Sequence, residues 1–121
     1  MFVTNPLGAQ LDQQVFNEGE GGLRGRGTPN INRNWDGGWH VTTQRTADGW
    51  IAEIAIPMVT LRFPEAEAQI WGLNLMRNIG GRNEQAFWAP IPKPYTIAKV
   101  SLAGTLTGMR SLGRGNDLRI T

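Results

Sequence analysis

Alternation of apolar and polar residues is clearest in the middle of the chain. Trp39–Arg45 alternates, an Asp-Gly turn signal follows, and Trp50–Ile56 alternates again. A period of two is typical of strands that pack one face on a core. A turn of two residues and a turn of four residues both place the apolar residues of the two strands on the same side of a hairpin. The pattern predicts a β-hairpin that ends at Pro57, which has no N–H for a ladder.

A second hairpin is predicted further along the chain. Ile70–Arg77 is strand-like, Asn78–Asn83 forms its loop and Glu84–Trp88 returns. Shorter strands are predicted at Phe2-Val3, Leu11–Phe16 and Leu118–Thr121, with one or two more in Thr96–Leu106 and a single helical turn at Met58–Arg62.

Glycine and proline punctuate the whole chain. The 121 residues include 16 Gly and 7 Pro, and no stretch between two of them exceeds ten residues. A typical helix has about 11–12 residues, so a helical bundle is excluded. Short elements cut by turns are typical of sandwiches and barrels, and this length is that of one domain. We therefore predict a single all-β domain over residues 1–121, with a long polar loop at 17–34.

Charge and cysteine content exclude several classes of function. With no Cys, the chain has no disulfide scaffold, Cys-ligated zinc or thiol nucleophile. No apolar run approaches the length of a membrane helix, and no signal peptide is recognisable at the start. The net charge of +2 is too small to indicate nucleic acid. The Gly/Arg segment Gly22–Gly27 is similar to segments that bind single strands, but Glu18 and Glu20 offset its two arginines, which favours a solvated loop.

Catalytic signatures are absent. The sequence contains no phosphate-binding loop, no nucleophile elbow and no zinc-protease motif. His40 is the only histidine, and we interpret it as an exposed strand residue. Asp36, Glu53 and Glu84 are candidates for the paired carboxylates of a glycosidase. The structural alternatives are a solvent-facing Glu53 and a cross-strand pair between Glu84 and Arg77.

The five tryptophans are the most informative residues. Trp39 and Trp50 belong to predicted apolar faces and are expected in the core. Trp35 and Trp88 border loops and are the better candidates for exposed platforms on which a sugar ring could stack. The side on which Trp71 lies is left open.

A series of short motifs resembles one known family, the family 9 carbohydrate-binding-module-like domain, in the version that precedes an outer-membrane β-barrel in bacterial proteins. The motifs are Asn5-Pro6-Leu7-Gly8, Trp35-Asp36-Gly37-x-Trp39, Gly49-Trp50-x-x-Glu53-x-x-Ile56-Pro57, Leu61-Arg62-Phe63, Trp71-Gly72-x-Asn74-x-x-Arg77 and Asn83-Glu84-x-x-x-Trp88-x-Pro90. The resemblance spans about residues 2–121.

The resemblance implies an antiparallel, jelly-roll-like β-sandwich that lacks the first third of the family domain. Open sheet edges then predict self-association. The expected location of the full-length protein is the periplasm, the outer membrane or the cell exterior, with contact to the membrane only through a barrel that this chain lacks. Some relatives hold calcium, but no calcium ligands are assignable here.

The function implied is non-catalytic binding of an oligo- or polysaccharide by Trp stacking and polar contacts. Trp88 matches a sugar-clamping Trp of the family, and Arg77 and Asn74 lie near it on the preceding strand. The resemblance does not assign the second Trp of the clamp, for which Trp39 and Trp71 are the candidates. The alternatives are a structural or interaction domain of a barrel protein that does not bind sugar, nucleic-acid binding through the Gly/Arg loop, and a hydrolase fragment. The expected partner is a glycan, with no nucleic acid.

Overall fold

The structure, a computed structural model, describes residues 1–20, 30–113 and 117–121. Strands make up 46% of it, the sheets are small and antiparallel, and no helix reaches seven residues within those ranges. The predicted all-β class is therefore confirmed. The two-sheet, jelly-roll-like sandwich stays a prediction, as does the single domain. No helix in the described part of the chain has the length and apolar character needed to cross a membrane.

Contacts within the chain define two compact units, which are interleaved in sequence. The first consists of Met1–Gln14, Ile31–Glu67 and Ser111–Thr121, and the second of Val15–Asn30 and Ala68–Arg110. The short strand β3 (Gln14–Val15) lies where the chain leaves the first unit, and β4 (Ile31–Asn32) lies where it returns.

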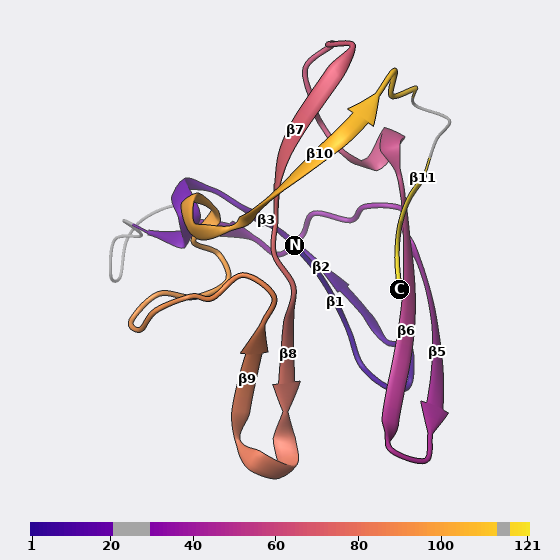
Figure 1. Cartoon of the computed structure of the whole chain (residues 1–121), viewed down its shortest axis with the longest axis vertical. Helices are drawn as coiled ribbons and strands as arrows, with labels where there is room; N and C mark the ends of the chain where they lie inside the picture. The colour runs from indigo at the N-terminus through magenta and orange to yellow at the C-terminus, as the bar shows by residue number, and fades with distance from the viewer. Residues whose placement is uncertain (21–29, 114–116) are drawn as a thin grey trace. The chain divides into compact units, whose positions relative to one another are not determined.

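A three-stranded sheet is the main element of the first unit. Its order is β11-β6-β5, and Figure 1 shows the long β5–β6 hairpin with β11 along β6. The strands are β5 (His40–Thr46), β6 (Gly49–Pro57) and β11 (Asp117–Ile120). Thr46 pairs with Gly49, so the predicted hairpin is confirmed with a turn of two residues. The short 3₁₀ helix η2 (Met58–Thr60) follows, where a helical turn was predicted.

The core of the first unit involves both faces of β6, because the adjacent residues Ala55 and Ile56 are both buried. The buried hydrophobic residues of the described chain all belong to this unit and are Trp39, Ala55, Ile56 and Met58. The hairpin of β1 (Phe2–Thr4) and β2 (Gln10–Asp12) packs here, with the Phe2 ring 5.3 Å from that of Trp39. The face that carries Ala55 also carries Glu53, which is exposed and forms an ion pair with Arg119 at 3.3 Å. The predicted alternation of exposed and less exposed residues holds along β6 as far as Ile54 and ends where Ala55 and Ile56 are both buried.

Two separate ladders form the second unit. The strands β7 and β10 pair with each other, and β8 pairs with β9. Their bounds, with those of the short 3₁₀ helices, are β7 (Ala68–Leu73), β8 (Met76–Ile79), η3 (Gly80–Arg82), β9 (Glu84–Phe87), η4 (Val100–Leu102) and β10 (Gly104–Arg110).

The prediction of one strand over Ile70–Arg77 was therefore wrong. The strand is interrupted at Asn74, whose side-chain Oδ1 accepts a hydrogen bond from the backbone N–H of Leu75 at 2.9 Å. A side chain that bonds its own neighbouring backbone competes with a ladder. As a result β7 pairs with β10, and only β8 pairs with the returning strand.

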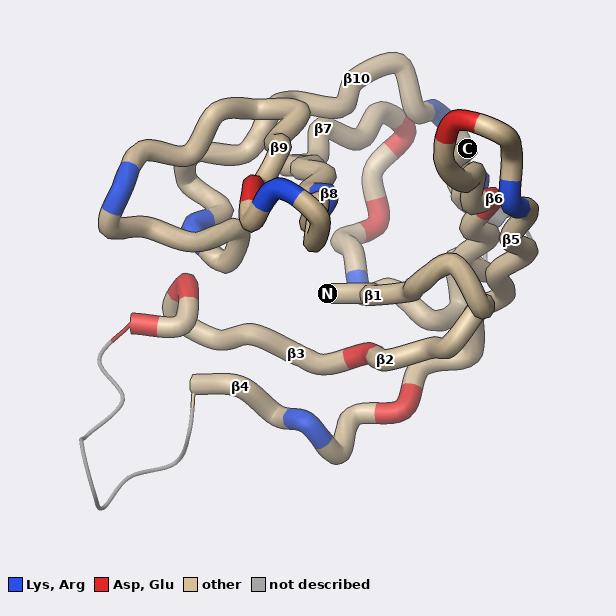
Figure 2. The backbone as a smooth tube through the Cα atoms, turned by 90° about the horizontal axis from the view of Figure 1, so that it is seen from below, with Lys and Arg blue, Asp and Glu red and all other residues tan. Residues whose placement is uncertain are grey.

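An ion cluster fastens the 3₁₀ turn η1 (Asn17–Gly19) within the second unit. The Lys99 ammonium lies 3.0 Å from the carboxylate of Glu18 and 2.7 Å from that of Glu20. The backbone N–H of Ser101 also donates to Glu18 at 2.6 Å. Hydrogen bonds from Ser101 and Lys99 lower the pKa of Glu18 to about 2. Elsewhere Lys and Arg are spread among Asp and Glu along the chain, as Figure 2 shows.

Candidate functional site

Trp88 lies directly after β9 and is exposed, with 57% of its surface accessible. Its indole packs on Gly104 at the start of β10. A Cβ at position 104 would lie 2.8 Å from Cη2 and 3.1 Å from Cε3 of the ring, and nearer still to Cζ3. Only glycine leaves room for a ring this close. The predicted exposure of Trp88 is confirmed, and its ring rests on a glycine.

The backbone around Trp88 is fixed by Asn74. The Asn74 amide donates from Nδ2 to the carbonyl of Ala89 at 3.0 Å, and its Oδ1 accepts the N–H of Ala89 at 2.9 Å. The N–H of Trp88 itself donates to the carbonyl of Leu75 at 2.9 Å. Asn74 thus holds the segment that carries Trp88, instead of pointing its amide freely into solvent.

Arg77 lies on β8 on the same face as Trp88. The register pairs Arg77 with Ala86, and residues two apart in a strand share a face. Arg77 and Trp88 are therefore diagonal neighbours, within reach of a long side chain. Glu84 pairs with Ile79, so it is a diagonal neighbour of Arg77 and not its direct cross-strand partner.

The two candidate partner tryptophans are placed differently. Trp71 is half-buried on β7, and its Nε1 donates to Gln69 at 3.2 Å. Leu73 pairs with Gly104, so Trp71 lies on the face of the β7–β10 ladder that also carries the Trp88 ring. Trp39 is only 5% exposed and belongs to the core of the first unit. Its burial leaves no ring face for a sugar and agrees with its expected role in the core.

Two of the residues considered for catalysis, His40 and Glu53, lie on the sheet of the first unit. His40 is exposed on β5 opposite Ala55, as expected for a solvent-facing strand residue. Glu53 faces solvent in its ion pair with Arg119, which confirms the structural interpretation of that carboxylate. No cluster of three or more His, Asp and Glu side chains occurs in the described residues that could hold a metal ion. The Gly/Arg segment Gly22–Gly27 lies outside the described residues.

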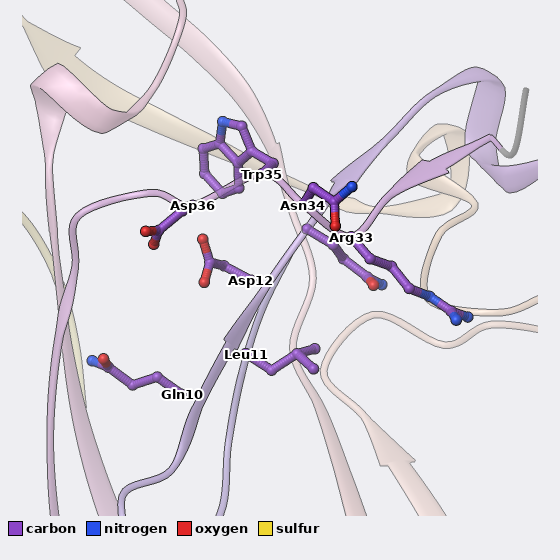
Figure 3. A pocket seen from close by; sticks show the side chains of 8 residues that line it. Gln10, Leu11, Asp12, Arg33, Asn34, Trp35 and Asp36 are labelled. Atoms are coloured by element: carbon purple, nitrogen blue, oxygen red, sulfur yellow. The ribbon is translucent and has the colours of Figure 1, made fainter.

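The sequence did not single out a polar pocket of about 290 Å³ in the first unit. Two short segments line it, one along β2 and one after β4 (Figure 3); the residues are Gln10, Leu11, Asp12, Gln13, Arg33, Asn34, Trp35 and Asp36. Trp35 was expected to be an exposed platform and is half-buried here. The Trp35-Asp36 pair was the only local signal of this site, because the meeting of the two segments depends on the fold.

A scan of protein-family models and searches of curated proteins and of solved structures found no match to this chain. The similarity to carbohydrate-binding modules therefore rests on the motifs quoted above.

Proposed function

We propose that this chain is a non-catalytic carbohydrate-binding domain that contacts its glycan through Trp88. The observation that supports this most strongly is an aromatic ring that is both exposed and held in place. The indole has 57% of its surface free, while Gly104 and the backbone bond to Leu75 fix its position. A fixed aromatic surface loses little conformational freedom when a ligand stacks on it.

Polar groups near the ring suit a sugar. Arg77 is a diagonal neighbour of Trp88 on the same face, and its guanidinium offers donors that match two adjacent hydroxyl oxygens. Asn74 acts as a positioning residue, since its amide holds Ala89 beside the platform. Trp71 lies on the face of the β7–β10 ladder that carries the Trp88 ring and offers a second indole there. The bound glycan would stack on Trp88 and receive hydrogen bonds from Arg77.

Calorimetric or NMR titration with neutral oligosaccharides tests the proposal. Trp88→Ala removes the stacking contact, for which aromatic pairs suggest about 1 kcal/mol, and is expected to lower the affinity at least severalfold. Ile70→Ala is the matched control, because Ile70 is also exposed and apolar and lies in the same unit. Equal affinity in a folded Trp88→Ala variant would exclude Trp88 from the site.

Failure of the unaltered chain to bind any neutral glycan favours the second candidate, an interaction domain. The observation behind that candidate is a set of apolar side chains that are more than half exposed: Leu7, Leu11, Phe16, Ile51, Val59, Ile70 and Val100. Exposed apolar side chains mark a site of contact with other proteins where they form a continuous patch. Light scattering of the purified chain separates the two, because an interaction surface predicts association and a sugar site does not require it. In either role the proposed location is the periplasm, the outer membrane or the cell exterior.

A further inference from the structure

The polar pocket of the first unit is braced by hydrogen bonds between the two segments that line it. Gln10 Nε2 donates to the carbonyl of Trp39 at 3.1 Å, and the N–H of Gly37 donates to the carboxylate of Asp12 at 2.5 Å. The ring of Phe2 meets that of Trp35 edge-on, with 5.8 Å between their centroids. The walls are thus held together from both segments, which fixes the position of the side chains between them.

The lining combines three kinds of chemistry. Asp12 and Asp36 supply carboxylate oxygens, and one oxygen of Asp12 is already used by Gly37. Arg33 and Asn34 supply N–H donors, and Trp35 supplies an aromatic surface. In Figure 3 the two carboxylates lie next to Trp35, while the Arg33 side chain extends away from them.

We infer that this pocket binds one ring of a neutral sugar, as a second contact separate from Trp88. Carboxylates accept hydrogen bonds from hydroxyl groups, guanidinium and amide groups donate to hydroxyl oxygens, and an indole stacks on the C–H face of a ring. The two carboxylates disfavour an anionic ligand. A volume of about 290 Å³ suits a small ligand and not a long peptide.

NMR titration of the whole chain with glucose, galactose, xylose and cellobiose tests this site separately from Trp88. The indole N–H of Trp35 and the amide N–H of Gly37 report on the pocket. We expect both signals to shift with sugar in the unaltered chain and in Trp88→Ala. In Asp36→Asn, which keeps the shape and removes the charge, we expect roughly tenfold weaker binding at these signals. Asp48→Asn, an exposed carboxylate in the β5–β6 turn of the same unit, is the matched control and should bind normally.

Each other outcome has a defined meaning. Shifts confined to Trp88 overturn the second contact and leave the first proposal standing. Shifts at Trp35 that Trp88→Ala abolishes show one site instead of two and also overturn it. A response to a lysine or arginine peptide but to none of the four sugars assigns the pocket to a cationic side chain. Unchanged sugar binding in Asp36→Asn removes the carboxylate from the site and refutes the chemistry proposed for it.

Discussion

Replacing Gly104 with alanine should displace the Trp88 ring from the position in which it packs on residue 104. The new Cβ would lie 2.8 Å from Cη2 of the indole, whereas carbon atoms pack at about 3.5–4.0 Å. The ring must therefore retreat by about 0.7 Å or more at that atom. Because the outer side of Trp88 is exposed, the ring can move into solvent, and the cost should be at the low end of overpacking, about 1 kcal/mol.

Two measurements check this expectation. The indole N–H signal of Trp88 should shift in Gly104→Ala, and the melting temperature should fall by about 4 °C. Gly80→Ala is the matched control, since no atom outside its chain neighbours lies within 4 Å of a Cβ at that position. An unmoved Trp88 signal in Gly104→Ala would refute the idea that a glycine is needed beneath the ring, and with it the fixed platform. A shift of equal size in both variants would do the same.

Three further predictions follow from single contacts. Asn74→Ala should lower the free energy of unfolding by about 1–3 kcal/mol in urea titrations, because two backbone N–H groups lose their acceptor. A loss below about 0.5 kcal/mol would contradict a stabilising role for these two hydrogen bonds. Trp39→Ala should cost about 3–5 kcal/mol or prevent folding, since it empties the core beside Phe2, and an unchanged melting curve would show that this core is not the stabilising one. Glu18 has a folded-state pKa of about 2, below its ordinary 4.5, so its bond to Ser101 stabilises above pH 4.5 and is lost as the pH falls toward 2. Acid titration followed by circular dichroism should show a smaller loss of stability across that range in Glu18→Gln, and equal losses would count against the cluster.

Local signals explain which strands could be predicted. The β5–β6 hairpin was predictable because its alternation, its short turn and Pro57 all act within a few residues. The interruption of the strand at Asn74 was not predictable, because the Asn74 side chain that bonds the neighbouring Leu75 N–H is oriented by Ala89, which is 15 residues away in sequence. The pairing of β7 with β10 was equally hidden, since alternation does not say which strands become neighbours.

Some features of the candidate site were also predictable from local sequence, and others were not. The exposure of Trp88 was predictable from its place between a hairpin loop and a proline-rich segment. The packing of the Trp88 ring on Gly104 was not predictable, because nothing in the sequence distinguishes Gly104 from the other glycines. The pocket of the first unit depends on Asp12 meeting Gly37, and residues brought together by folding leave no spacing pattern to recognise.

The pairing of β11 with β6 has a consequence for the order of folding. Pro57 pairs with Asp117, and residues 68–110 of the second unit lie between them in sequence. Contacts so far apart raise the contact order, and the entropy of closing such a loop must be overcome before the pairing stabilises the chain. During synthesis the central strand β6 has only β5 beside it until β11 emerges. The sheet is therefore completed late, after most of the second unit has been made.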